Sequence, residues 1–384
     1  MYIVSRETLR IRKLPILILA LLVLGLCLPA TSLVKAQELT WRREGHTIIV
    51  TGPDFEVHFV DYGALTGLWV GGYQILRSLS FCPRGPQREW VGDNTYWGDI
   101  IESTVKELPG GALRVILRTQ VPKDDAEAKQ MYFTFEFVYT VYPSGMIMLN
   151  MSTKAYKESR SARQYTGITI PVQTFAGGKA YAVYGGATSA LDCPVEYERG
   201  ELASGTFSAF YTVFKDISLV IIALDPPSLG YGWWDCRDWD DPSYGMFIDW
   251  NWPMPAPEGF EWHAALLIWA HTMGKAVTEK LVSAFGNLGA AKSMLEALHK
   301  RSLRTPGGKK YLSAAETEVK LAYDALRKGD YDGMYTHASR AMDVINQILT
   351  VERNQRILLY MVIPGIIAVA IVTFSLKSCL SKPE

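Results

Sequence analysis

Alternation of apolar and polar residues with a period of two constrains this chain more than any other feature. The pattern runs from Trp41 to about Thr272, in segments separated by Gly, Pro, Asp or Asn. No long amphipathic helix interrupts the series, which includes FEVHFV, ALRVILRT, MYFTFEFVYTVY, MIMLNMST, YTGITIPV, FSAFYTVF and ISLVIIAL. Many strands without intervening helices favour an antiparallel sandwich or barrel over a fold that alternates strands with helices.

The segment MYFTFEFVYTVY divides its residues between two chemically different faces. One face suits a hydrophobic core and carries Met131, Phe133, Phe135, Phe137 and Tyr139. The other face is amphipathic and carries Tyr132, Thr134, Glu136, Val138 and Thr140. We expect this second face either to line a groove or to lie beneath another sheet.

The period changes after about Lys275, where apolar residues recur at spacings of three and four. This pattern predicts three helices, in AVTEKLVSAFGNLGAAKSMLEALHKR, YLSAAETEVKLAYDALRKGD and YDGMYTHASRAMDVINQILTVERNQ. Seven of the eleven tryptophans fall between Trp233 and Trp269, and none follows. We therefore predict a β-sandwich over residues 37–273 and a helical stalk over residues 274–355.

Both ends of the chain carry apolar stretches. Residues 1–36 have the layout of a secretory signal peptide, with basic residues, an apolar run, and small residues at Val34 and Ala36. An uncleaved N-terminal anchor is the alternative. Residues 357–376 carry no charge and are long enough to cross a hydrocarbon core of about 30 Å. We predict a transmembrane helix over residues 356–376 and a cytoplasmic tail over residues 377–384.

Composition narrows the possible partners and the source of stability. The formal net charge is zero and no basic stripe is present, so we expect no nucleic-acid partner. Cys82, Cys193 and Cys236 lie in the region predicted to be extracellular, which allows at most one intramolecular disulfide and leaves its pairing open. A sequon at Asn150 lies in a predicted strand, and its modification is an open alternative.

The run WWDCRDWDD and its continuation combine flat aromatic rings with carboxylates, the groups that stack on sugars and bond their hydroxyls. The candidate carbohydrate-binding residues are Trp233, Trp234, Asp235, Asp238, Trp239, Trp250 and Trp252. Two alternatives stay open. The tryptophans are also typical of a sandwich core, and Asp235, Asp238, Asp240 and Asp241 are candidate ligands of a calcium loop, although their spacing matches no EF-hand.

Glu261 and His263 alternate on a predicted strand, so they share a face and are candidates for general acid/base catalysis. His58 joins them if the first and last strands of the sandwich are neighbours. The alternative is that all three are ordinary polar residues of a sheet surface.

Two segments carry a resemblance to known domains. IVTGPDFEVHFVDYGALTGLWVGGYQIL, from Ile49 to Leu76, and PEGFEWHAALLIWAH resemble the opening and closing strands of galactose-mutarotase-like β-sandwich domains. Such domains occur in sugar epimerases and as accessory domains of glycoside hydrolases and polysaccharide lyases. The chain lacks their histidine motifs, so no catalytic residue is carried over. The turn in ALRKGDYDGMYTHASRAM resembles a tetratricopeptide-like helical hairpin, which occurs once.

The expected fold is mainly β, with a large antiparallel β-sandwich followed by a small helical bundle and one transmembrane helix. The expected function is that of a single-pass protein of the cell membrane whose extracellular sandwich binds a glycan or cell-surface polysaccharide. No cofactor is predicted, although calcium is possible. One alternative is a carbohydrate-active enzyme of the epimerase, hydrolase or lyase type. The other is a structural or assembly protein of the cell surface.

Overall fold

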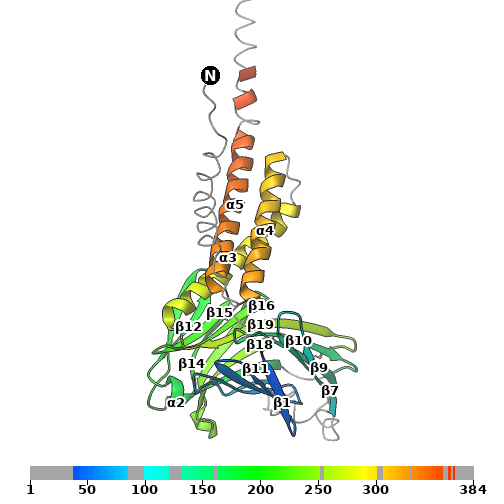
Figure 1. Ribbon diagram of the computed structural model, residues 1–384, viewed down its shortest axis with the longest axis vertical. Coiled ribbons are helices and arrows are strands. Elements are labelled where there is room, and N and C mark those ends of the chain that lie inside the picture. Colours follow the sequence, from blue (N-terminus) through cyan, green and yellow to red (C-terminus); the bar gives the residue numbers. More distant parts are fainter. Residues whose placement is uncertain are drawn as a thin grey trace, which may run out of the picture. The chain divides into compact units, whose positions relative to one another are not determined.

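The segments with period-two alternation form two antiparallel sheets, as the pattern predicts (Figure 1). The first sheet has ten strands, in the order β1 (Thr40–Glu44), β2 (Thr47–Thr51), β3 (Phe55–Val60), β4 (Leu65–Val70), β6 (Ser78–Arg84), β11 (Arg163–Pro171), β18 (Ser243–Trp250), β17 (Leu229–Asp235) and β14 (Glu201–Phe207), with β5 (Tyr73–Leu76) paired to β4. The predicted antiparallel sandwich is therefore confirmed.

The second sheet has nine strands. Their order is β13 (Ala187–Asp192), β12 (Lys179–Tyr184), β15 (Ala209–Phe214), β16 (Ile217–Asp225), β19 (Glu261–His271), β10 (Met146–Ala155), β9 (Phe133–Val141), β8 (Leu113–Gln120) and β7 (Asp99–Glu107). Two short helices, α2 (Val172–Phe175) and the 3-10 helix η3 (Cys236–Trp239), lie in the connections between strands.

The computed structural model describes residues 38–84, 99–120, 132–159, 163–250, 255–300, 306–328, 330–357, 362–364 and 366–367. From Leu39 onward the chain belongs to one compact unit. The predicted signal peptide at residues 1–36, Trp252, the side chain of Cys82 and the predicted tail at residues 377–384 lie outside the described residues.

The core lies between the inward faces of the two sheets. On β9, Phe133, Phe135, Phe137 and Tyr139 are all almost completely buried, as their alternation predicts. The hydroxyl of Tyr139 donates a hydrogen bond of 2.8 Å to the carbonyl oxygen of Gly63, in the turn between β3 and β4. This bond satisfies the one polar atom of a ring that would otherwise be costly to bury.

Three helices follow the sandwich, as the change of period predicts: α3 (Lys275–Lys300), α4 (Pro306–Arg327) and α5 (Tyr331–Ile357). They lie next to the nine-stranded sheet (Figure 1) and share a second hydrophobic cluster with its outer face. In this cluster Trp269 of β19 and Tyr211 of β15 are buried together with Leu281 and Leu288 of α3. The helices therefore cover part of one sheet face, in addition to leading toward the C-terminal end.

Within the described part of the chain, no helix is both long enough and apolar enough to cross a membrane. α5 ends at Ile357, and of the segment 358–376 the structure describes only residues 362–364 and 366–367. Most of the predicted membrane helix at residues 356–376 therefore lies outside the described residues, and the anchor stays a prediction.

Candidate functional site

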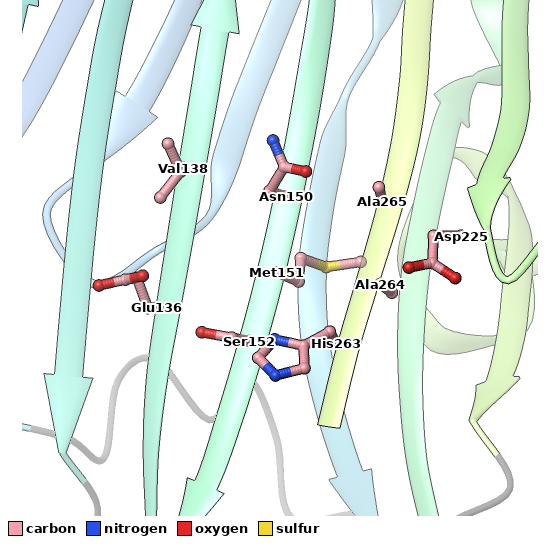
Figure 2. A pocket seen from close by; sticks show the side chains of 9 residues that line it. All are labelled: Glu136, Val138, Asn150, Met151, Ser152, Asp225, His263, Ala264 and Ala265. Atoms are coloured by element: carbon pink, nitrogen blue, oxygen red, sulfur yellow. The ribbon is translucent and has the colours of Figure 1, made fainter. Parts of the chain in front are cut away.

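A polar groove lies on the outer face of the nine-stranded sheet, across β8, β9, β10, β19 and β16, and Figure 2 shows the part of it that reaches from β9 to β16. It consists of two adjoining hollows of about 220 and 350 Å³, which share Glu136, Ser152 and His263. Its other polar side chains are Arg118, Thr134, Asn150, Lys154, Asp225 and Glu261. Glu136 and Val138 belong to the amphipathic face of β9, which therefore lines a groove.

Strand register aligns the polar side chains of the groove in rows across the sheet. Arg118 is paired with Glu136, Glu136 with Ser152, and Ser152 with His263, so one row crosses four neighbouring strands. Directly opposite residues on one face of an antiparallel pair have Cβ atoms about 4.5–5.5 Å apart. The row therefore brings the Arg118 guanidinium together with a carboxylate, a hydroxyl and an imidazole on one surface; Figure 2 shows the last three, on Glu136, Ser152 and His263.

Ion pairs join the two cationic side chains of the groove to neighbouring carboxylates. Nε of Arg118 donates a hydrogen bond of 3.0 Å to Glu136, and Nη1 of Arg118 lies 3.6 Å from Glu102. Nζ of Lys154 donates one of 2.7 Å to Glu261, and this bond lowers the pKa of the Glu261 carboxyl. Two cationic and three carboxylate side chains line the groove, so its charge is negative when His263 is neutral.

Of the predicted catalytic residues, Glu261 and His263 do lie together, because both project from the outer face of β19 into one hollow. His58 does not join them, since β3 belongs to the ten-stranded sheet and β19 to the nine-stranded sheet. Nε2 of His58 donates a hydrogen bond of 2.7 Å to Oε1 of Glu56, and the ring lies against Trp69. The prediction that His58 joins Glu261 and His263 in one site is therefore wrong.

The run WWDCRDWDD is divided between the core and the surface. Trp233 is 1% exposed, packs against Phe210 and Tyr244, and donates a hydrogen bond of 3.1 Å to the carbonyl oxygen of Asp192. Trp250 is 2% exposed and donates one of 2.8 Å to Oγ1 of Thr166. Both tryptophans are core residues, so their predicted role in ligand contact is wrong.

Trp234 and Trp239 lie on the outer side of the ten-stranded sheet. Trp239 is 54% exposed and Trp234 is partly exposed, with ring centroids 5.8 Å apart. These two rings and the exposed Asp238 are the part of the predicted carbohydrate contact that reaches solvent; Trp252 is not described.

Asp235 has a structural role at this corner. Its carboxylate is buried and forms a 2.6 Å ion pair with Arg237. Burial raises the pKa of Asp235, but the hydrogen bonds from Arg237 and from two backbone N–H groups outweigh it, so the pKa is lowered. Asp235 is thus held as a buried carboxylate that anchors its own turn, and it is not free to bind a ligand.

The four aspartates of the calcium hypothesis have different environments. Asp235 pairs with Arg237, Asp241 forms an ion pair of 2.7 Å with Arg77, and Asp240 is exposed. Across the ranges that the structure describes, no three His, Cys, Asp or Glu residues are grouped so that they could hold a metal ion. The four aspartates therefore do not form one ligand set.

Sequence reasoning did not single out Arg118, Asn150, Ser152, Lys154 or Asp225 as site residues. Asn150 belongs to the sequon and is an exposed mid-strand residue at the groove. The available signal was polar residues at alternate positions in the middle of otherwise apolar strands, as in the segment from Met148 to Lys154. That pattern marks a solvated face, but it does not show that the faces of four strands are aligned.

No family model and no curated protein matches this chain. Solved structures do match it. The Slr1438 protein from Synechocystis sp. PCC 6803 is similar with 11% identity and a TM-score of 0.42, over 62% of this chain and 96% of that one. Galactose 1-epimerase from Lactobacillus acidophilus is similar with 9% identity and a TM-score of 0.40, over 61% and 98%.

A third similar structure is the GH36 alpha-galactosidase AgaB from Geobacillus stearothermophilus, with 9% identity and a TM-score of 0.40, over 62% of this chain and 41% of the enzyme. The last two are a sugar epimerase and a glycoside hydrolase. At such low identities and TM-scores, the chemistry of the groove follows from its own residues alone.

Proposed function

We propose that the sandwich binds a neutral carbohydrate in the polar groove. The observation that carries the proposal is the row from Arg118 through Glu136 and Ser152 to His263, which sets alternating donors and acceptors along one hollowed surface. Carboxylates accept hydrogen bonds and guanidinium and ammonium groups donate them, whereas a sugar hydroxyl does both. A ligand that presents several hydroxyls therefore fits this row.

The charge of the groove favours a neutral sugar over an acidic one. Glu136, Asp225 and Glu261 outnumber Arg118 and Lys154, and each cation already has a carboxylate partner beside it or within the groove. A uronic acid or sugar phosphate would bring a further negative charge next to these carboxylates, which is unfavourable at such short range.

Binding is favoured over acid/base catalysis by the state of Glu261. The hydrogen bond from Lys154 lowers the pKa of this carboxyl, and a carboxylate with a lowered pKa is a weaker base.

A second candidate function is that of an epimerase-type enzyme. It draws on Glu136 and His263, which flank Ser152 in one row. Polarimetry on free hexoses with and without the protein distinguishes the two functions, because an epimerase accelerates the interconversion of anomers and a binding protein does not.

The binding proposal is tested by saturation-transfer NMR of the full-length chain with methyl hexopyranosides and methyl glucuronide. We expect transfer to at least one neutral glycoside and weaker transfer to the glucuronide. Glu136→Gln and His263→Ala should each weaken binding at least tenfold. Glu56→Gln and His58→Ala are matched controls, since this Glu–His pair lies on the other sheet. Equal loss in both pairs, or no transfer to any neutral glycoside, would contradict the proposal.

We also propose that the sandwich is displayed outside the cell on a C-terminal membrane anchor. The support is the sequence pattern at the two ends, a signal-like segment at residues 1–36 and an uncharged apolar segment at residues 357–376. Protease added to intact cells should digest the sandwich and leave an epitope placed after Glu384 protected. Protection of the sandwich would reverse the proposed orientation. An N-terminus at Gln37 would show cleavage of the signal, and an intact Met1 would show a second anchor.

A further inference from the structure

Three aromatic rings lie side by side on the outer face of the ten-stranded sheet, on a different sheet from the polar groove. They belong to Trp234 of β17, Trp239 of η3 and Phe247 of β18, and we call them the aromatic platform. The ring centroid of Trp239 lies 5.8 Å from that of Trp234 and 5.9 Å from that of Phe247. The planes of the Trp234 and Trp239 rings are inclined to each other by 32°, and the Phe247 ring meets Trp239 at 73° in an edge-to-face contact, so Phe247 supports Trp239 from the side.

Glycines beneath two of the rings allow them to lie close to the sheet. Gly232 is opposite Phe247 and Trp234 is opposite Gly245, so glycine and aromatic residues alternate in both directions across β17 and β18. A Cβ atom at position 232 would lie 2.8 Å from Nε1 of Trp234, and one at position 245 would lie 2.7 Å from Cε2 of Phe247. The rings therefore rest on the backbone, and any larger residue at either glycine would displace them.

The corner that carries Trp239 is held by Arg237. Its guanidinium donates hydrogen bonds to the carbonyl oxygens of Pro194, Val195 and Glu196, at 3.0, 2.7 and 2.9 Å, and it pairs with the buried Asp235. Asp235 also caps η3, since its carboxylate accepts a hydrogen bond of 3.2 Å from the backbone N–H of Arg237. The turn that carries the exposed ring is thus held in place before any ligand arrives, which reduces the entropy lost on binding.

Polar groups border the platform. The hydroxyl of Tyr197 donates a hydrogen bond to Asp238, and both residues are exposed. The neighbouring exposed charges are mostly acidic: Glu196, Glu198, Glu201, Asp238 and Asp240, against Arg199. This balance is unfavourable for an anionic lipid surface or an acidic polymer, whereas carboxylates bond well to sugar hydroxyls.

We propose that the aromatic platform is a second carbohydrate-binding surface, one that stacks against the C–H faces of a neutral polysaccharide chain. Flat rings provide stacking area, and the Tyr197–Asp238 pair provides hydrogen bonds at its edge. The site is independent of the polar groove, because the two lie on different sheets. One sandwich then holds a carbohydrate at two places, and simultaneous occupation of both strengthens attachment to a polymer.

The experiment is native affinity electrophoresis of the full-length chain in gels that contain hydroxyethylcellulose, galactomannan or arabinoxylan, with carboxymethylcellulose as the anionic counterpart of the first. We expect at least one neutral polysaccharide to retard the protein, and carboxymethylcellulose to retard it less than hydroxyethylcellulose does if cellulose chains are bound. Trp239→Ala should weaken the retarding interaction at least tenfold, and Gly232→Ala should weaken it by displacing Trp234.

Two control variants test whether the platform itself binds the polysaccharide. Trp41→Ala removes a tryptophan that is 44% exposed on the edge strand β1, and it should leave retardation unchanged. His263→Ala should weaken binding of the methyl hexopyranosides without abolishing retardation, whereas Trp239→Ala should do the reverse. Failure of the groove proposal and failure of this one are therefore distinguishable. Thermal unfolding of each variant shows that it is folded. Absence of retardation by all three neutral polysaccharides, or wild-type retardation of folded Trp239→Ala, would overturn the proposal.

Discussion

Nε2 of His271, the last residue of β19, lies 3.1 Å from Oγ1 of Thr278 in the first turn of α3. Nδ1 of the same ring accepts a hydrogen bond of 3.1 Å from the backbone N–H of Met273. Because Nδ1 accepts, the neutral ring carries its proton on Nε2 and donates it to Thr278. A neutral buried imidazole thus joins the sandwich to the helices.

This arrangement predicts that the folded protein is less stable at acidic pH. Burial lowers the pKa of His271 from 6.5 to about 4, so the unfolded chain binds the proton more readily than the folded one. The neutral ring therefore contributes its full stabilisation above pH 6.5. As the pH falls toward 4, the free energy of unfolding decreases by about 3 kcal/mol. Urea unfolding between pH 7 and pH 4.5 measures it. His271→Gln should show a smaller loss over this interval, and parallel curves for the two proteins would contradict the prediction.

The helices are expected to stabilise the sandwich. A chain that ends at residue 274 would expose apolar side chains of the nine-stranded sheet that α3, α4 and α5 cover, among them Tyr211, Leu267 and Trp269. We expect this fragment to unfold at lower urea concentration than the full-length chain and to bind a hydrophobic dye. Leu281→Ala, at a buried position of α3, should cost about 2–5 kcal/mol, and Met294→Ala, at an exposed position, less than about 1 kcal/mol. A soluble fragment with an unchanged unfolding midpoint would show that the contact contributes nothing.

Two tryptophans six positions apart should respond in opposite ways to substitution. Trp233→Ala removes a buried ring and its hydrogen bond to Asp192, so we expect a loss of about 3–5 kcal/mol in the free energy of unfolding. Trp239→Ala removes a ring that is 54% exposed, so the loss should be about 1 kcal/mol or less. Chemical denaturation of both variants measures the difference. A large loss for Trp239→Ala would mean that the platform is part of the core.

The Asp235–Arg237 pair should be far more important for stability than the ion pairs of the groove. Arg237→Met leaves a buried carboxylate without its partner and three carbonyl oxygens without a donor, so we expect a loss of about 3–5 kcal/mol. Arg118→Met breaks a partly exposed pair and should cost about 1 kcal/mol or less. Urea denaturation compares the two, and faster proteolysis between residues 193 and 200 should accompany the first. Equal losses would refute the structural role of Arg237.

Much of the fold was accessible from local pattern. Alternation alone predicts that the face of β9 with Phe133, Phe135 and Phe137 lies in the core, as it does, and the helices begin at Lys275, where the period changes. These predictions hold because side-chain direction in a strand or helix depends on neighbours one to four residues away. The candidate site was less accessible. Alternation predicts that Glu261 and His263 lie on one face, because they are two residues apart on one strand. Arg118, Glu136 and Ser152 come together only through the register of neighbouring strands.

The sequence by itself determined which residues alternate, where strands give way to helices, and which short runs combine aromatic rings with carboxylates. Only the tertiary structure decided that His58 lies on a different sheet from His263, that Trp233 is buried while Trp239 is exposed, and that Asp235 is bound by Arg237. The physical reason is that periodicity places a side chain on one face of its own strand. The order in which strands pair, and what then covers each face, depends on contacts between residues far apart in the chain.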